Sequence, residues 1–293
     1  MDGTWKVSVW GTRGSTPVTG KDFLEYGGNT SCISVDCKHR LVVFDAGSGL
    51  ASLGKVLEKR DWKNRKKRVD ILISHLHLDH VQGLFAFDLM HDKKAEIHLY
   101  GAREAEFEKS LRTLVGRPYW PLGLADFAAD IRIHEIHAGE SFCLADEETS
   151  QEREMSGMPG LRIHTILGSH PGGSLLYRLE SGDKSIVYLL DCEQDEHMLR
   201  KLPEFGREGN LVIWDAGFSP EDLAKHAGWG HSSWRQGVEL QRRARADRIL
   251  MTHYFQNYTD SFLREQERLA RLSAPACLFA REGMELWIGS RKQ

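Results

Sequence analysis

The segment His-Leu-His-Leu-Asp-His at residues 75–80 constrains this chain more than any other feature. It directly follows Val69–Ser74, an apolar stretch typical of a buried strand. If the extended conformation continues, alternate side chains face the same way, so the first two histidines point to one side while Leu76 and Leu78 anchor into the core. Imidazole and carboxylate groups are typical ligands of zinc and similar metals, and such a cluster rarely occurs without one. The segment therefore predicts a metal site at the end of a buried strand.

Further ligands are expected downstream, because four residues are too few to hold two metal ions. Three residues share a position after a later apolar stretch: His170, Asp191 and His253. A carboxylate at the end of an apolar strand can bridge two cations. Each residue alone would be a weak signal, since a histidine or aspartate at a strand end is often only a turn former. Their shared position is what makes them candidate ligands.

Strand-like stretches alternate with segments of helical spacing along the chain. We predict strands at Trp5–Trp10, Ser31–Asp36, Leu41–Asp45, Val69–Ser74, Ile97–Tyr100, Leu161–Ile166, Ser174–Leu179, Ile186–Leu190, Leu211–Trp214 and Arg248–Thr252. We predict helices at Leu50–Arg60, Val81–Met90, Arg103–Val115, Ser232–Ala246 and Asp260–Leu272. The stretches Ala276–Phe279 and Met284–Ile288 suggest a final hairpin. Two strand-rich halves with intervening helices favour an α/β fold of two sheets packed face to face, and residues 1–293 are expected to form a single domain.

Composition and charge restrict the function classes. The formal net charge of −3 does not favour a general binder of polyanions. No apolar run approaches the roughly 20 residues that cross a bilayer, and the start of the chain lacks the features of a signal peptide. The 5 cysteines are scattered without a Cys-x-x-Cys pair, which favours a reducing, cytoplasmic setting.

Residues 75–80 match the His-x-His-x-Asp-His signature of the metallo-β-lactamase superfamily, and the three downstream candidates fall in the order that this superfamily uses. The resemblance extends from Gly11 almost to the end of the chain. It implies the four-layer αββα metallo-β-lactamase sandwich, with the site at one edge of the two sheets. It also implies two divalent metal ions, zinc by preference and manganese as the alternative. The implied ligands are His75, His77 and His170 for the first ion, Asp79, His80 and His253 for the second, and Asp191 between them.

Two such cations with a hydroxide between them suit hydrolysis of phosphate esters, and equally of amide, thioester or lactone carbonyls, because coordination lowers the pKa of bound water toward ~7. The segment Gly230-His231-Ser232-Ser233-Trp234 is similar to the Gly-His-Ser-Thr segment of the phosphodiesterase branch of the superfamily. That branch includes tRNA 3′-processing ribonucleases (tRNase Z) and cyclic-nucleotide phosphodiesterases. By this likeness His231 would be a general acid, or a phosphate clamp when protonated, and it would be a catalytic residue together with Asp79. The alternative is a histidine near a helix N-terminus that is bonded to backbone.

Two features distinguish the chain from the ribonucleases of that branch. They carry a long arm for gripping tRNA between the positions of His170 and Asp191, where this chain has only two predicted strands and a turn at residues 180–184. The aspartate is also followed by Cys192-Glu193 and not by the more usual threonine. We therefore predict a phosphodiesterase for a small phosphodiester such as a cyclic nucleotide, with neither nucleic acid nor a membrane as partner; a homodimer is compatible with the resemblance. A lactonase or thioesterase on the same scaffold and a non-catalytic nucleotide sensor stay open as alternatives.

Weaker signals surround these residues. Three residues of a proline-containing loop form a candidate substrate lid: Arg117, Tyr119 and Trp120. Trp229 and Trp234 flank His231 and could shape its pocket, although both the lid and the pocket tryptophans could equally be ordinary packing. Asp45 ends a predicted strand and is similar to a superfamily aspartate that orients a metal-bound histidine.

Overall fold

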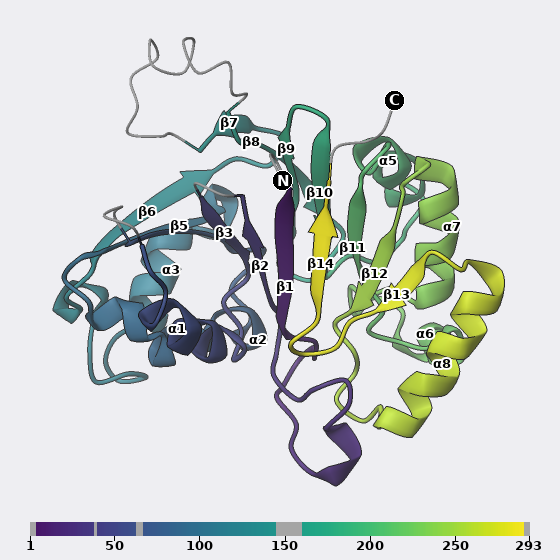
Figure 1. Cartoon of the computed structure of the whole chain (residues 1–293), viewed down its shortest axis with the longest axis horizontal. Helices are drawn as coiled ribbons and strands as arrows, with labels where there is room; N and C mark the ends of the chain where they lie inside the picture. Colours follow the sequence, from purple (N-terminus) through teal and green to yellow (C-terminus); the bar gives the residue numbers. More distant parts are fainter. Residues whose placement is uncertain (1–3, 38–39, 63–66, 145–159, 290–293) are drawn as a thin grey trace.

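The computed structural model describes residues 4–37, 40–62, 67–144 and 160–289. Within these ranges, two seven-stranded sheets lie face to face and helices cover their outer sides (Figure 1). The predicted four-layer αββα arrangement is therefore observed. Most of the first sheet comes from the N-terminal half of the chain and the second sheet from the C-terminal half, so the two halves meet along the centre of the molecule.

Strand order brings the ends of several parallel strands together. The first sheet runs β14 (Glu285–Ile288), β1 (Trp5–Gly11), β2 (Cys32–Asp36), β3 (Leu41–Phe44), β4 (Lys67–Leu72), β5 (Ala95–Ala102) and β6 (Asp130–Ile136). The second runs β13 (Cys277–Phe279), β12 (Ile249–Thr252), β11 (Leu211–Asp215), β10 (Lys184–Leu189), β9 (Ser174–Ser181), β8 (Arg162–Gly168) and β7 (Ser141–Cys143). Neighbours from β3 to β6 and from β10 to β13 are parallel. Loops that follow such strands lie at the same edge of a sheet, which is where ligands bind in α/β proteins.

The inner core lies between the two sheets and reaches the site edge. Phe44 at the end of β3 stacks on Tyr188 of β10, with ring centroids 4.8 Å apart and both side chains fully buried. Such a pair contributes ~0.5–1.5 kcal/mol beyond its buried area. The Tyr188 hydroxyl donates to Asp45 Oδ2 at 2.7 Å. The core thus fixes the position of the first polar residue after β3.

The outer helices bury one face each. The helices are α1 (Leu50–Glu58), α2 (Leu78–Val81) and α3 (Phe107–Leu114) on the first sheet, and α5 (Met198–Phe205), α7 (Trp234–Ala244) and α8 (Asp260–Ser273) on the second. Each sheet and its covering helices enclose an outer core, the first on the first sheet and the second on the second sheet. Trp234 at the start of α7 is buried in the second outer core, where its Nε1 donates to Gln266 of α8 at 2.7 Å. Among the described helices, none has the length and apolar character needed to cross a membrane. That residues 1–293 form one domain stays a prediction.

The predicted C-terminal hairpin is wrong. β13 pairs in parallel with β12 in the second sheet, whereas β14 pairs antiparallel with β1 in the first. The turn at residues 281–283 therefore carries the chain from one sheet to the other. Two short apolar stretches joined by a turn are typical of a hairpin, but the pairing partners that decide the matter are distant in sequence.

The predicted helix Val81–Met90 is also wrong. The α-helix ends at Val81 and two 3-10 turns follow, Gln82–Ala86 and Asp88–His91. Here the Gly83 amide donates to the Ala46 carbonyl at 2.8 Å, and a Cβ on Gly83 would meet the Gly47 carbonyl oxygen at 2.0 Å. This close approach to the loop after β3 replaces a regular helix. The sequence reasoning also missed β6, β7, α5 and the short helix α6 (Pro220–Leu223).

Candidate metal centre and active site

All the predicted ligands meet at the sheet edge where the parallel strands end. Their positions are His75 and His77 after β4, Asp79 and His80 in α2, His170 after β8, Asp191 after β10 and His253 after β12. Two of them, and Asp45 after β3, have a left-handed backbone, with φ of 53° at Asp191, 64° at His253 and 57° at Asp45. Residues other than glycine seldom adopt this conformation, and outliers of this kind cluster at functional sites.

The expectation for the leucines of residues 75–80 is only half right. Leu76 packs partly against the first outer core, but Leu78 is 58% exposed instead of anchored. The reason is local: α2 begins at Leu78, so the alternation of the strand ends one residue earlier. The turn into α2 nevertheless leaves both Asp79 and His80 buried at the site.

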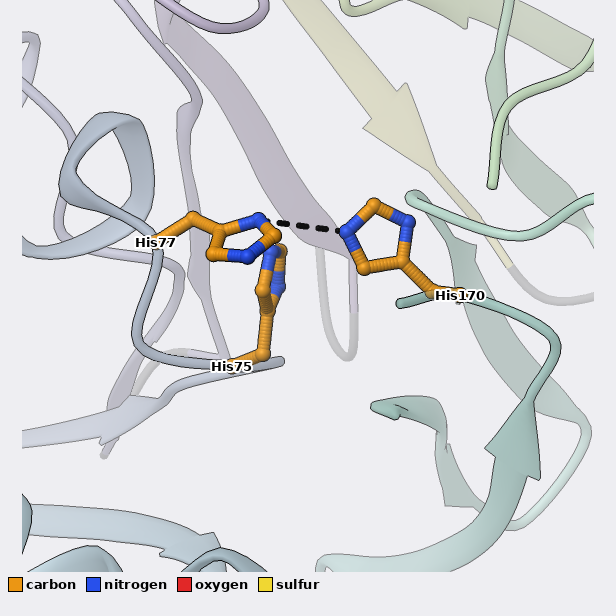
Figure 2. Close-up of side chains that lie close together, drawn as sticks. All are labelled: His75, His77 and His170. Carbon is orange, nitrogen blue, oxygen red and sulfur yellow. Dashed lines mark hydrogen bonds between the residues drawn. The ribbon is translucent and has the colours of Figure 1, made fainter. Parts of the chain in front are cut away.

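Three histidines form a first group of possible ligands: His75, His77 and His170. Their ring nitrogens lie within 4.8 Å of one another, and Figure 2 shows the His77 and His170 rings turned toward each other, with His77 Nδ1 and His170 Nε2 3.2 Å apart. Nδ1 of His170 lies 3.0 Å from the Gly230 carbonyl oxygen, which fixes the ring. Burial lowers the pKa of all three histidines and so favours the neutral imidazole that binds metals.

A second group consists of Asp79, His80 and His253, whose ligand atoms also lie within 4.8 Å of one another. Asp79 Oδ2 is 3.1 Å from His80 Nε2 and 3.3 Å from His253 Nε2. The same oxygen accepts the Ser15 amide at 2.7 Å. Burial opposes protonation of both rings, but nearby carboxylates, Asp191 first among them, raise the pKa of His80 and of His253. This group is therefore rich in negative charge that a cation could neutralise.

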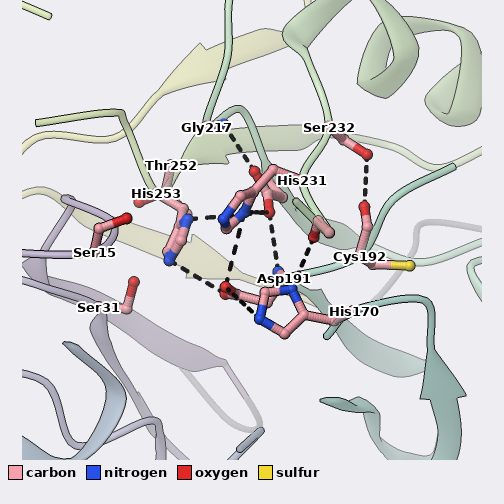
Figure 3. Close-up of polar contacts among 12 residues, drawn as sticks. Ser15, Ser31, His170, Asp191, Cys192, Gly217, His231, Ser232, Thr252 and His253 are labelled. Atoms are coloured by element: carbon pink, nitrogen blue, oxygen red, sulfur yellow. Dashed lines mark hydrogen bonds and ion pairs between the residues drawn. The ribbon is translucent and has the colours of Figure 1, made fainter. Parts of the chain in front are cut away.

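Asp191 lies between the two groups, and Figure 3 shows its carboxylate beside His170 of the first group and His253 of the second. Its Oδ1 is 4.0 Å from His75 Nε2 and 3.8 Å from His170 Nε2, while its Oδ2 is 3.2 Å from Nε2 of both His80 and His253. The side chain is buried, and neither Asp191 Oδ2 nor His75 Nε2 has a hydrogen-bond partner among the described residues. Buried polar atoms without partners are rare unless an ion or water binds them. The donor set therefore fits divalent cations, while their identity, their number and the ligand assignment stay predictions.

His231 faces this cluster from the loop before α7. Its Nδ1 is 2.9 Å from Asp215 Oδ2 and 3.8 Å from Asp191 Oδ1. The alternative of a histidine bonded only to backbone is therefore wrong. Burial would lower the pKa of His231, but the carboxylates of Asp215, Asp191 and Asp79 raise it to about 9. Cations bound beside Asp191 would lower this pKa again, because like charges disfavour the imidazolium.

Asp215 is a site residue that the sequence reasoning missed. It is the last residue of β11, and besides contacting His231 it accepts the Asp191 amide at 3.0 Å and the Gly217 amide at 2.7 Å. A carboxylate that ends an apolar strand was the signal that identified Asp191, and Asp215 ends the next strand with the same pattern. Applying that signal to every such strand would have found it.

Comparison with known proteins decides the family. The family described as "Beta-lactamase superfamily domain" matches residues 40–254, well over half of the chain. The chain belongs to this family. The curated ribonuclease Z of Deinococcus radiodurans is similar to it, with 25% identity over an alignment that covers 84% of this chain and 94% of the relative.

Solved structures share the fold of this beta-lactamase superfamily chain. The metallo-beta-lactamase fold protein YhfI from Bacillus subtilis superposes with a TM-score of 0.70 at 17% identity, covering 98% of this chain and 100% of that chain. A diphosphatase of the PhnP family superposes with a TM-score of 0.65 at 17% identity, covering 97% of both chains. The predicted αββα fold is confirmed. The family match and the ribonuclease Z relative support the prediction of a metal-dependent hydrolase.

Asp45 supports the second ligand group of this superfamily member. Its Oδ2 lies 2.7 Å from His80 Nδ1 and accepts the hydroxyls of Ser74 and Tyr188, while its Oδ1 accepts the Ser74 amide. The contact with His80 is the one expected of an aspartate that orients a metal-bound histidine.

For Asp45→Asn we expect the cation at Asp79, His80 and His253 to be held about 10- to 100-fold less tightly, the usual effect of losing such a partner. The neutral amide keeps the size of the side chain but removes the charge that orients His80. Competition with a chromophoric chelator would measure both affinities. Asp92→Asn is a matched control, because Asp92 pairs with Lys67 at the opposite end of β4. Wild-type affinities in the Asp45 variant would contradict the orienting role.

The candidate lid has different surroundings. Trp120 stacks on Phe85 with ring centroids 4.6 Å apart, and Tyr119 is 68% exposed. Trp120 therefore packs on the segment just after α2, while the role of Arg117 and Tyr119 at the site stays a prediction.

Proposed function

We propose that this chain is a two-metal phosphodiesterase that uses His231 as its general acid. The observation that carries the proposal is the pair of His231 and Asp215, placed against Asp191 between two groups of ligand-type residues. A positioned proton donor assists the departure of an alkoxide from phosphorus and from a carbonyl carbon alike, so the choice of a phosphodiester depends on the likeness of residues 230–234 to the phosphodiesterase branch. A lactonase or thioesterase on the same scaffold is therefore the less favoured reading.

The proposed first cation would bind to His75, His77 and His170, the second to Asp79, His80 and His253, and Asp191 would contact both. Zinc suits the mixture of imidazole and carboxylate, with manganese as the alternative. When bound, two divalent ions supply an activated water and neutralise charge on the attacked phosphoryl group. Asp79 counts as catalytic in this proposal because its carboxylate, held by the Ser15 amide, lies between His80 and His253.

His231 would provide the proton. Its Nδ1 contacts Asp215, so the other ring nitrogen is left to face a leaving oxygen. Nearby carboxylates, Asp215 first among them, raise the pKa of the ring and so favour its protonated form. Asp215 would hold the ring in place and stabilise the charged form, the part that a carboxylate behind a catalytic histidine commonly plays.

The proposed substrate is a small phosphodiester such as a cyclic nucleotide. β9 and β10 are joined by a turn of Gly182 and Asp183 alone, so no tRNA-gripping arm leaves the chain between His170 and Asp191. The net charge of −3 also agrees with a small substrate. The likeness to a protein named ribonuclease Z keeps RNA as the competing substrate, and the first experiment must include it.

We expect metal removal to abolish hydrolysis and metal return to restore it. The experiment assays a chelator-treated sample, before and after adding zinc or manganese, on 3′,5′-cyclic AMP, bis-p-nitrophenyl phosphate, a tRNA precursor, a lactone and a thioester. Metal-dependent cleavage of the first two, with little cleavage of the tRNA precursor, is the expected result. Cleavage of the lactone or thioester alone would overturn the proposal. Binding of a nucleotide without turnover of any compound would indicate a sensor.

A further inference from the structure

The turn that leads into His231 has an unusual construction. Gly228 and Gly230 both have a left-handed backbone, with φ of 81° at each, and they flank Trp229. The Glu193 carboxylate accepts the Gly228 amide at 2.8 Å and the Gly230 amide at 3.2 Å. Hydrogen bonds from amides to a carboxylate are stronger than those between neutral groups. One side chain thus fixes the backbone on both sides of Trp229.

The ring that this turn presents is exposed although it is large and apolar. Trp229 is 55% exposed, whereas Phe218, the ring beneath it, is 2% exposed. Phe218 is in edge contact with Trp229, at 6.2 Å between centroids, and with His231, at 5.7 Å. His226 contacts the Trp229 ring from another side at 4.8 Å. Trp229 therefore lies one ring away from the proposed general acid and is held there by aromatic contacts.

The turn is also joined to the ligand groups. The Gly230 carbonyl oxygen lies 3.0 Å from His170 Nδ1, and a Cβ on Gly230 would meet that nitrogen at 2.1 Å. The Glu193 amide donates to the Ser169 carbonyl at 2.7 Å. The contacts that position His170 therefore also position Trp229 relative to the ligands. The turn is not an independent loop.

From these contacts we propose that Trp229 is a stacking platform for the nucleobase of a nucleotide whose phosphate lies at His231, and that Glu193 is the residue that positions it. The proposal rests on the phosphodiesterase function and names its substrate class, a phosphodiester that carries a flat heterocycle. Every base has a π-face, so an indole recognises the heterocycle with little preference for its identity. Exposed tryptophan on a flexible loop would lose much of this binding energy to ordering, and the Glu193 contacts reduce that loss.

The experiment measures binding by calorimetry in the metal-loaded protein, with adenosine 5′-monophosphate and methyl phosphate as ligands. The quantity of interest is the nucleotide preference, defined as the Kd of methyl phosphate divided by the Kd of adenosine 5′-monophosphate. We expect Trp229→Ala to reduce the preference for the nucleotide about 5- to 100-fold, the range that base stacking supplies, and Trp229→Phe to keep most of it. An unchanged ratio in Trp229→Ala would overturn the proposal.

Glu193→Ala tests the positioning role. It should lower the same ratio of Kd values. The double variant with Trp229→Ala should have the same ratio as Trp229→Ala alone, because the two substitutions remove the same stacking interaction. Additive losses would mean that Glu193 acts elsewhere. Hydrolysis of bis-p-nitrophenyl phosphate by the wild-type protein is assayed in parallel. If the wild type hydrolyses the ester but Trp229→Ala leaves the Kd ratio unchanged, only the stacking proposal fails. If Trp229→Ala changes the ratio but the wild type hydrolyses no phosphodiester, only the phosphodiesterase proposal fails.

A phosphorothioate-linked RNA of six nucleotides, which resists cleavage, separates the two sources of a nucleobase. Affinity similar to that of the monophosphate supports a free nucleotide as ligand. Much tighter binding supports an RNA chain, and Trp229→Ala should weaken either complex. RNA binding that ignores the Trp229 substitution would count against the platform.

Discussion

Replacing His231 with alanine is expected to lower kcat about 10²- to 10⁴-fold on a phosphodiester with an alkoxide leaving group, the usual contribution of a general acid. The same variant should lose much less on bis-p-nitrophenyl phosphate, because p-nitrophenolate leaves without being protonated. Steady-state kinetics on both substrates, with metal content measured in the same samples, gives the comparison. His164→Ala is a suitable control, since its ring contacts Ser141 and Glu180 on the far strands of the second sheet.

The pH profile provides an independent check on His231. A general acid works in its protonated form, and the carboxylates around this ring raise its pKa to about 9. Wild-type kcat should therefore be sustained at neutral pH and fall as the pH rises through the His231 pKa, at a lower pH if bound cations reduce that pKa. The falling limb should vanish in His231→Ala. Equal losses on both substrates, or a profile that the substitution leaves unchanged, would contradict the role.

An equally large loss of activity is expected for Asp191→Asn. The carboxylate directs one oxygen to His75 and His170 and the other to His80 and His253, so its charge serves both ligand groups. We expect bound metal to fall below two equivalents and kcat/KM to fall at least ~10³-fold. Metal ions contribute several kcal/mol of transition-state stabilisation, and each 1.36 kcal/mol is a factor of ten.

The matched control for that variant lies on the same loop. Asp195 accepts the Met198 amide at the start of α5 and has no described contact with the ligand groups. Asp195→Asn should therefore keep both its metal and its activity. Metal analysis by mass spectrometry and a thermal melt of each variant separate lost metal from lost folding. Two tightly bound equivalents in Asp191→Asn would refute the bridging position.

Much of the site could be predicted because its ligand-type residues occur in local sequence patterns. Residues 75–80 form one dense motif, and each downstream ligand ends an apolar stretch that is easily recognised as a strand. The structure brings all seven residues together because the parallel strands of the two sheets and the antiparallel strand β8 end at one edge. The same reasoning applied consistently would have included Asp215, which differs from Asp191 only in coming one strand later.

The failures share a physical cause. The hairpin prediction for β13 and β14 and the helix prediction for Val81–Met90 both relied on local periodicity, while the outcome depended on distant partners. β14 completes the first sheet against β1, and the turn at Gly83 forms because its amide reaches Ala46. The contacts of Glu193 with the turn around Trp229 also join residues far apart in sequence, so that no spacing rule would reveal them.

The left-handed backbone at Asp45, Asp191 and His253 has a consequence for how this chain can change over evolutionary time. Glycine adopts that conformation without steric cost, whereas each of these side chains pays for it in strain. A substitution to glycine, which would relieve this strain, would therefore remove a carboxylate or an imidazole from the centre of the site. Stability and chemistry favour different residues at the same three positions, and a descendant freed from selection for activity would be expected to lose its site there first.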